Sequence, residues 1–227
     1  MAESGERAPG LITDRLVVRP WQSEDAGRLF DIYRRVEVVR WIGAEPMREH
    51  READAMIERM SARLELDPRF GAWAVVERSS GVPVGGVSLK PIPDGDGEFE
   101  IAWQLHPDSW GRGFASEAAG AVLKRGFADG LPEVWALTYL DNDRSAAVCR
   151  RIGMQLLGIT NRWYGTPLLM FWTGSGSAQE PSFGPDATAG TAARLPSPTA
   201  APERAVPPRR LGASYGPPAE SPTPRIP

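Results

Sequence analysis

The 227-residue sequence has few of the residues that build disulfides and metal centres. Cysteine occurs once, at Cys149, and histidine only twice, at His50 and His106. A single cysteine excludes an intramolecular disulfide and a cysteine-rich metal site, and two histidines are too few for a typical histidine cluster. We therefore predict no metal centre, and we expect the chain to work in a reducing, cytoplasmic environment.

The sequence also lacks long apolar runs and a strong excess of one charge. No stretch is long enough to span a bilayer, and the first residues carry acids without an apolar segment, so we expect neither a membrane location nor a signal peptide. The formal net charge is -3, which gives no broad cationic field for nucleic acid. Lysine occurs only at Lys90 and Lys124, and this preference for arginine is typical of a GC-rich bacterial genome.

Proline is concentrated at the C-terminal end of the sequence. Twelve of the 22 prolines follow Gly174, in a segment of Ser, Ala, Gly and Pro that has no apolar periodicity. Such a segment cannot bury enough apolar surface to offset its ordering entropy, so we expect a disordered tail over residues 174–227. A docking segment for a partner is the alternative, because Pro-rich stretches are recognition ligands. We expect a flexible N-terminus over residues 1–10 and one domain over residues 11–173.

Within this domain, β-branched runs alternate with apolar residues at helical spacing. We predict a strand at 16–20, a helix capped at 23–25 and continuing to about 36, a helix over 49–66, strands at 72–77, 84–89 and 98–105, a helix over 116–128, a strand at 134–139, a short helix at 144–152 and strands at 156–162 and 168–172. The first strands form an antiparallel meander, and a βαβ unit follows it. The fold class is therefore α/β (or α+β), with a mixed, mostly antiparallel sheet of about seven strands.

The segment 110–115, Trp-Gly-Arg-Gly-Phe-Ala, lies between a predicted strand and a predicted amphipathic helix. Its two glycines and its alanine let the backbone approach a ligand, and the first turn of the helix presents unpaired N–H groups. The helix dipole, the Arg112 guanidinium and the Ser116 hydroxyl add attraction for a phosphate. We interpret this loop as a pyrophosphate site.

Two other phosphate-binding loops fit the sequence less well. A P-loop requires Gly-Lys-Ser/Thr after the glycines, and none is present. A dinucleotide fingerprint requires a third small residue, for which Ser116 is a partial match, and an acid that closes the next strand, whereas Glu133 precedes that strand. Glu100 and Gln104 also interrupt the apolar run that a central parallel strand would have. Dinucleotide binding stays a lesser alternative.

The order of the elements and the loop itself resemble the GNAT acetyltransferase superfamily. Its pyrophosphate signature is Gln/Arg-x-x-Gly-x-Gly/Ala, which Gly113 and Ala115 match, whereas Trp110 replaces the first residue. In the subgroup similar to ribosomal-protein N-terminal (alanine) acetyltransferases, Trp-Gly-x-Gly-Phe/Tyr-Ala-Ser/Thr-Glu-Ala is common, and residues 110–118 have this pattern.

Two further blocks support the same resemblance, which covers about residues 11–173. Residues 141–154 look like the family's Asn-x-x-Ser segment with its Gly-Phe/Met ending, and residues 13–21 are similar to the first strand of the subgroup. The resemblance implies helices on both faces of the sheet, acetyl-CoA as cofactor, and a sheet that splays open beside the loop. The main chain of residues 104–106 would then pair with the pantetheine arm, and one N–H would polarise the thioester oxygen. The implied cofactor-binding residues are Gln104, Leu105, His106, Trp110, Gly111, Arg112, Gly113, Phe114, Ala115, Ser116, Asn142 and Ser145.

The catalytic assignments rest on the same resemblance. Glu100 takes the position of a glutamate that recurs in the subgroup, so we assign it as general base, acting directly or through water, with Glu98 on the same strand face as substitute. The alternative for Glu100 is a salt-bridged acid on a half-buried strand. Many relatives place a tyrosine as general acid where this chain has Cys149, which we interpret as a packing residue. Ser145, Tyr164 or water then remains as proton donor.

Other candidate residues have structural alternatives that stay open. Asn142 binds the cofactor or a neighbouring backbone group, and Ser145 either caps the short helix or lies near the cofactor sulfur. Trp41 and Tyr164 lie in segments that line the acceptor cleft in relatives, so with Glu100 they are the candidate substrate-binding residues, although such aromatics also cover cores. We assign no side-chain role to His50 or His106.

The sequence thus predicts an enzyme that moves an acetyl group from acetyl-CoA to a primary amine, either a protein N-terminus or a small molecule. The alternative is a GNAT-like sensor or scaffold that binds acyl-CoA and does little chemistry, which the replacement of the tyrosine by Cys149 supports. We expect a monomer or a homodimer.

Overall fold

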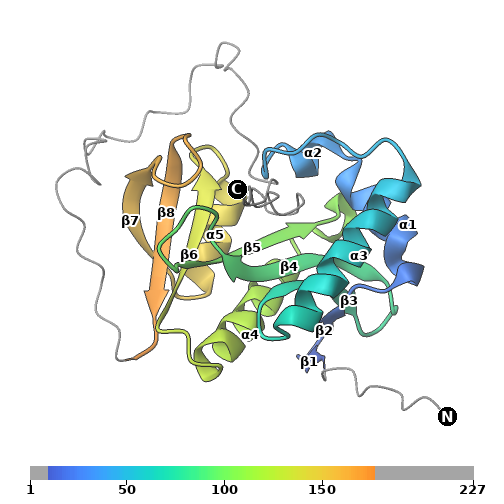
Figure 1. The fold of residues 1–227 in the computed structure, drawn as a ribbon, viewed down its shortest axis with the longest axis horizontal. Coiled ribbons are helices and arrows are strands. Elements are labelled where there is room, and N and C mark those ends of the chain that lie inside the picture. The colour runs from blue at the N-terminus through green and yellow to red at the C-terminus, as the bar shows by residue number, and fades with distance from the viewer. Residues whose placement is uncertain (1–9, 177–227) are drawn as a thin grey trace, which may run out of the picture.

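The computed structural model describes residues 10–176 (Figure 1). Most of the predicted flexible N-terminus and of the predicted disordered tail lie outside these residues. The final strand ends at Gly174, where the tail is predicted to begin. Within the described part of the chain, no helix is long and apolar enough to cross a membrane, and no group of three or more His, Cys, Asp or Glu side chains is placed to hold a metal ion.

The elements follow the predicted order (Figure 1). They are β1 (Leu11–Ile12), β2 (Leu16–Pro20), the 3-10 helix η1 (Ser23–Asp25), α1 (Ala26–Tyr33), α2 (Val36–Val39), α3 (His50–Leu66), β3 (Gly71–Glu77), β4 (Pro83–Pro91), β5 (Phe99–Leu105), the 3-10 helix η2 (Pro107–Ser109), α4 (Phe114–Ala128), β6 (Glu133–Tyr139), α5 (Asp143–Arg151), β7 (Gln155–Thr160) and β8 (Leu168–Gly174). Apart from the first helix, the predicted boundaries differ from these by one or two residues.

The first helix is where the prediction is wrong in detail. Its start is capped by Gln22, whose side chain forms a capping box with Asp25, so the predicted cap lies inside η1. The helix also ends at Tyr33, and Val36 begins the separate helix α2. Val36 continues the apolar spacing of the first helix in the sequence, but it is 62% exposed and does not belong to the buried face of α1.

The sheet has eight strands in the order β1-β2-β3-β4-β5-β6-β8-β7. All neighbours are antiparallel except β5 and β6, which are parallel and joined through α4. The mixed, mostly antiparallel sheet with a βαβ unit is confirmed, and the additional strand is β1, whose two residues are too short for a periodic pattern. β5 and β6 pair in register only at Glu100 and Trp135, so the two strands diverge beyond that point.

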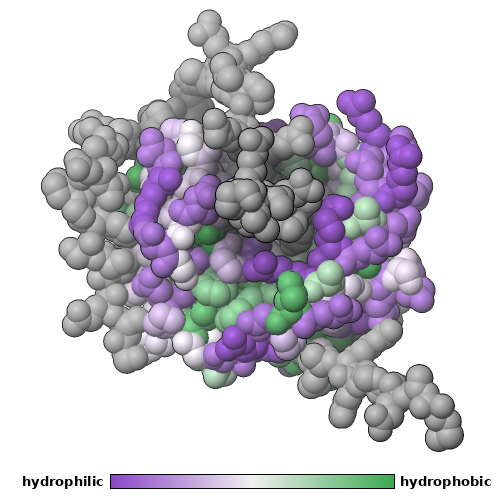
Figure 2. Space-filling view, viewed as in Figure 1, coloured by the Kyte–Doolittle hydropathy of each residue, from purple (hydrophilic) through white to green (hydrophobic). Residues whose placement is uncertain are grey.

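Helices cover both faces of the sheet, as expected. On β3, Ala72 and Ala74 face the buried residues of α1 and α3, whereas Trp73 and Val75 face those of α4. This alternation follows from the two-residue period of a strand. The outer surface over α1 and α3 is largely hydrophilic (Figure 2), as expected for amphipathic helices that bury one face.

A third buried cluster covers the β6–β8 end of the sheet. It contains Trp135 and Trp172 from the strands, together with Trp163 and Tyr164 from the loop between β7 and β8. The Trp135 and Trp163 rings meet edge to face at 5.5 Å between centroids. This packing fixes the loop against the sheet and brings Tyr164 next to β5, although the two are more than sixty residues apart in the sequence.

Candidate active site

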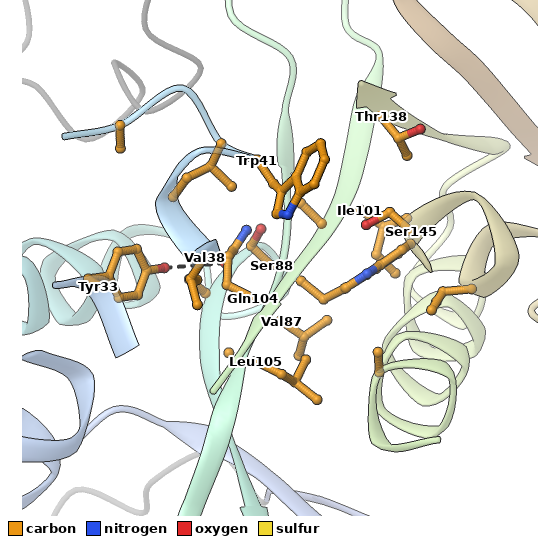
Figure 3. A pocket seen from close by; sticks show the side chains of 18 of the residues that line it. Tyr33, Val38, Trp41, Val87, Ser88, Ile101, Gln104, Leu105, Thr138 and Ser145 are labelled. Atoms are coloured by element: carbon orange, nitrogen blue, oxygen red, sulfur yellow. Dashed lines mark hydrogen bonds between the residues drawn. The ribbon is translucent and has the colours of Figure 1, made fainter. Parts of the chain in front are cut away.

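A cavity of about 1500 Å³ lies where β5 and β6 diverge (Figure 3). One half is lined by the strand end 103–105, the loop 109–113 and the first turns of α4 and α5. The other half is lined by α1, α2, α3 and the cavity-facing side chains of β4 and β5. We call these the loop half and the strand half, and both contain residues that the sequence singled out.

The end of β5 presents different main-chain groups from those predicted. The His106 N–H donates to the Val84 carbonyl at 2.9 Å, and the His106 carbonyl accepts from the Ser109 N–H at 3.0 Å, so neither group is available to a ligand. Because hydrogen bonding alternates along an antiparallel strand, Gln104 also turns its main chain toward β4, and Trp103 and Leu105 turn theirs toward the open side. The prediction for the main chain of Gln104 and His106 is therefore wrong.

The side chains at this strand end are engaged within the protein. The His106 ring is buried, with Nε2 2.9 Å from Asp31 Oδ2 and Nδ1 accepting from the Asp108 N–H, so it closes the strand end and caps η2. The Gln104 side chain lines the cavity and accepts a hydrogen bond from the Tyr33 hydroxyl at 3.2 Å (Figure 3). His106 has a structural role here, and Gln104 belongs to the cavity surface.

The loop 110–115, predicted to be an anion cradle, leads directly into α4. Gly111 and Gly113 have φ values of +75° and +79°, a left-handed conformation that favours glycine. Gly113 is the N-cap of α4 and, without a side chain, satisfies none of the first N–H groups that an α-helix leaves unpaired. The Ser116 hydroxyl in this turn is buried and has no hydrogen-bond partner within residues 10–176. A buried unpaired hydroxyl beside free helix N–H groups fits a phosphate ligand.

Trp110 and two arginines complete the loop half. The Trp110 indole N–H donates to the Leu105 carbonyl at 2.8 Å and so ties the loop to β5. Arg112 lines the cavity, where its guanidinium is paired with Glu77 and lies over the Phe114 ring. Arg144 lies over the Trp110 ring at 4.7 Å and also lines the cavity.

Sequence reasoning missed Arg144, although it lies inside the recognised 141–154 block. Two other predicted cofactor-binding residues contribute little side chain to the cavity surface. Phe114 is 1% exposed, so its ring belongs to the core and its N–H is the group that faces a ligand. Ala115 is partly buried against the same core. The loop half is therefore made mostly from main chain.

The 141–154 block contains the whole of α5 and the residues on either side of it. Asn142 is the N-cap, and its Oδ1 accepts from the Ser145 N–H at 3.1 Å, so the capping role belongs to Asn142 and the suggested capping role of Ser145 is wrong. Both residues line the cavity, and Ser145 is seen in Figure 3. Cys149, one turn further, is fully buried in the core, and burial raises the pKa of its thiol to about 12. A thiol in this environment is a packing residue.

Glu100 lies at the last position where β5 pairs with β6. The side chain lines the cavity but is only 6% exposed. The Tyr164 hydroxyl donates to Glu100 Oε2 at 2.6 Å, and the Leu137 N–H also donates to this carboxylate. Burial raises the pKa of the Glu100 carboxyl, while Lys90 and the two hydrogen bonds act to lower it. Burial and the Glu100 charge raise the pKa of the Tyr164 phenol, which keeps it protonated.

Lys90 is a further cavity residue that the sequence did not single out. It lies on β4 directly opposite Glu100 and lines the same cavity. Burial lowers the pKa of its ammonium group, whereas the Glu100 charge raises it. A signal for this residue was present in the Pro-Asp-Gly-Asp-Gly segment 93–97, which is typical of a turn and separates two predicted strands. A hairpin centred on residue 95 places residues 90 and 100 opposite each other.

Of the remaining candidates, Trp41 lines the cavity, whereas Glu98 and His50 do not. Glu98 lies in the turn before β5, where it accepts from the Asp96 N–H and pairs with Arg162 at 3.0 Å, and it does not line the cavity. Trp41 does line the cavity (Figure 3), with the Arg40 guanidinium 4.1 Å from its ring. The His50 ring packs on Phe30 at 4.1 Å between centroids.

Comparisons with known proteins give a consistent result. A family model described as "Acetyltransferase (GNAT) domain" matches residues 15–155. The chain is 31% identical over 163 residues to the "Uncharacterized N-acetyltransferase YoaA" of Bacillus subtilis (strain 168), a match that covers 70% of this chain and 92% of that protein.

Solved structures with a similar fold include acetyltransferases of other bacteria. One is an acetyltransferase from Agrobacterium tumefaciens str. C58, with a TM-score of 0.63 at 24% identity over 77% of this chain and 99% of that one. Another is the ribosomal-protein-S5-alanine acetyltransferase from Vibrio fischeri, with a TM-score of 0.61 at 18% identity over 76% of this chain and 100% of that one.

Proposed function

The chain belongs to the GNAT acetyltransferase family, and from this premise we propose that it acetylates a primary amine with Glu100 as general base. As a member of the family it is an acetyl-CoA-dependent N-acetyltransferase that acts on amine acceptors. One observation carries the proposal for the mechanism. The buried Glu100 carboxylate lies where β5 and β6 part, in the cavity that also contains the phosphate cradle.

The loop half holds the cofactor in this proposal. The free N–H groups at the start of α4, the Ser116 hydroxyl and Arg144 bind the pyrophosphate. The main-chain groups of Trp103 and the N–H of Leu105, on the open side of β5, hold the pantetheine arm, while the Leu105 carbonyl is occupied by the Trp110 indole N–H. When bound, acetyl-CoA supplies the acetyl group as an activated thioester. A main-chain N–H of β5 then stabilises negative charge on the thioester oxygen, as in an oxyanion hole.

The proposed proton transfers use Glu100 in the strand half and Ser145 in the loop half. Glu100 takes the proton from the attacking amine, directly or through a water molecule, and its charged form is held by the Tyr164 hydroxyl and the Leu137 N–H. The Tyr164 proton is committed to this hydrogen bond while Glu100 is charged. We therefore assign Ser145, at the start of α5 on the cavity surface, as the donor that passes a proton to the departing thiolate and regains one from water, with direct transfer from water as the alternative.

The acceptor enters from the side of α2 and α3. Trp41 lines this part of the cavity together with Glu100 and Tyr164, so an amine that reaches Glu100 passes an aromatic surface. A protein N-terminus and a small-molecule amine both present a primary amine on a narrow stem. We propose a cytoplasmic enzyme that uses one of these two acceptor classes.

The test is a thiol-release assay with acetyl-CoA and a panel of amines that includes short peptides, polyamines and aromatic amines. We expect turnover on at least one class, and Glu100→Gln should lower kcat/KM by about 10²- to 10⁴-fold, the usual contribution of a general base. Calorimetry should give an unchanged affinity for acetyl-CoA, because the cradle is untouched.

Glu98→Gln is the matched control. Glu98 is an acid two residues away that lies outside the cavity, so its loss should leave kcat/KM close to the wild-type value. Wild-type turnover in Glu100→Gln would contradict the assignment of the base. Stabilisation of the wild-type protein by CoA without turnover on any amine would favour the sensor or scaffold.

A further inference from the structure

We propose that Lys90 is a positioning residue that keeps the Glu100 carboxylate charged and therefore able to accept the amine proton. This inference rests on the proposed role of Glu100. It assigns Lys90 a function through Glu100, without contact between Lys90 and the reacting atoms. The argument starts from the register of β4 and β5 and then considers the charges around Glu100.

The register places Lys90 and Glu100 opposite each other on adjacent antiparallel strands. Both side chains line the cavity, so they lie on the same face of the sheet. Directly opposed residues in such a pair have Cβ atoms about 4.5–5.5 Å apart, which keeps the two side chains in mutual reach along their length. The next pair on this face is Ser88 and Ala102, which also line the cavity. The Lys90 and Glu100 pair therefore forms the charged end of the strand half.

Three groups act on the Glu100 carboxylate, and they come from three different elements. Lys90 acts from β4, the Tyr164 hydroxyl from the loop between β7 and β8, and the Leu137 N–H from β6. Only Lys90 carries a formal charge, since the other two are neutral hydrogen-bond donors. From α3, Arg63 acts on Lys90 and disfavours its charge, whereas Glu100 favours it. The two charges of the pair therefore support each other.

A base must be charged at the working pH, and burial opposes this for Glu100. Burial is the largest cause that raises the pKa of its carboxyl, and an opposite charge within about 4–6 Å lowers a carboxyl pKa by roughly 1–3 pH units. Lys90 is thus the group whose charge offsets the burial of Glu100. Arginine is the common basic residue of this chain, with lysine at only two positions, and one of them is here.

The test is the pH profile of kcat/KM for the wild-type enzyme, Lys90→Met and Lys90→Arg, with the best amine of the panel. Lys90→Met removes the charge and keeps most of the volume. The acid limb of the profile should then move to higher pH by about 1 pH unit or more, and the rate at high pH should recover to nearly the wild-type plateau. Lys90→Arg keeps the charge and should keep the limb close to its wild-type position.

Lys124→Met is the matched control, because it removes the other lysine, which lies exposed on α4, and should leave the profile unchanged. An equal loss of rate by Lys90→Met at every pH, or an unchanged profile, would overturn the inference. If thermal unfolding shows that Lys90→Met is poorly folded, Lys90→Gln gives the same comparison with a neutral polar side chain.

A double variant separates this inference from the proposed function. In the Glu100→Gln background, Lys90→Met should cause no further shift of the profile, because the group through which Lys90 acts is gone. If Glu100→Gln itself retains wild-type activity, the proposed base is wrong. If Glu100→Gln loses activity while Lys90→Met leaves the acid limb in place, only the role of Lys90 is wrong.

Discussion

The two halves of the cavity are built in different ways. At the centre of the loop half lies the main chain of one continuous stretch, the loop 110–115 and the first turn of α4, with two glycines in the left-handed conformation. The strand half uses side chains from separate elements, namely Lys90 of β4, Glu100 of β5 and Tyr164 of the β7–β8 loop. The first half is a local structure, and the second exists only after the sheet has formed.

In the proposed mechanism, the loop half binds the cofactor and the strand half contains the general base. Main-chain N–H groups at a helix start recognise an anion whatever the surrounding side chains are, so the loop half tolerates most substitutions that keep its backbone conformation. The strand half sets the protonation state of one carboxylate through burial and three neighbours, so single side chains change it directly. Substitutions in the two halves should therefore have separable kinetic effects.

Gly113→Val should have the largest effect and should act on binding. The left-handed φ of +79° is strained for a β-branched residue, at a cost of about 1–2 kcal/mol, and the added Cβ would lie 3.4 Å from the Arg15 guanidinium, so the loop conformation should change. We expect calorimetry to show a loss of acetyl-CoA affinity of about 100-fold. Gly27→Ala in α1, where an added Cβ contacts nothing within 4 Å, is the control. Unchanged affinity in Gly113→Val would mean that the main chain of this loop does not hold the cofactor.

Tyr164→Phe should act on chemistry with little effect on binding. It removes the hydrogen bond to the buried Glu100 carboxylate, so the pKa of that carboxyl should rise by about 1 pH unit. The charged form of Glu100 is lost as the pH falls through this pKa, so the acid limb of kcat/KM should move to higher pH and the rate below the limb should fall about 10-fold. A stopped-flow or steady-state pH profile measures this. If the KM for acetyl-CoA rises and the acid limb of kcat/KM stays in place, Tyr164 acts in cofactor binding instead.

Trp110→Phe should have a smaller effect, because it changes the link between the loop and β5. The substitution removes the hydrogen bond from the indole N–H to the Leu105 carbonyl, worth about 1 kcal/mol, and keeps a ring under Arg144. The KM for acetyl-CoA should rise about 5-fold at nearly constant kcat. Trp163→Phe is the matched control, since that indole N–H is buried without a partner in the described structure. Equal effects of the two substitutions would remove any special role for Trp110.

Cys149→Ala should have the smallest effect on activity. The thiol is fully buried in the core and its pKa is raised to about 12, so its removal should leave kcat within about 2-fold of the wild-type value. The lost packing should lower the free energy of unfolding by about 1 kcal/mol, which urea denaturation can measure. A large loss of kcat in a folded Cys149→Ala protein would show that this position does contribute to catalysis.

The parts of the fold that the sequence predicted are those with strong local patterns. The apolar stripe of α3 and the β3–β4 hairpin were found to within a few residues, because their periodicity is long and their turns are marked by Gly and Pro. The first helix was wrong beyond Tyr33 because Val36 has the helical spacing but is exposed. β1 was missed because two residues carry no period.

The site shows the same division between local and non-local information. The loop could be predicted because the role of a glycine at the start of a helix depends on the loop's own residues and not on distant parts of the chain. The main-chain assignment at His106 failed because its N–H partner, Val84, belongs to another strand and its hydrogen-bonding side depends on register. The pairing of Arg112 with Glu77 was not predicted, because Glu77 lies on β3, far away in the sequence.

The sequence by itself determined the family and the acetyl donor, and it predicted the loop that we propose as the cradle, because these depend on short segments whose conformation is set by their own residues. Only the tertiary structure decided which groups surround Glu100. Its neighbours Lys90, Leu137 and Tyr164 come from three separate parts of the chain, and the burial that raises its pKa is produced by all of them together. A carboxylate becomes a base through its environment, and that environment forms only when the sheet closes around it.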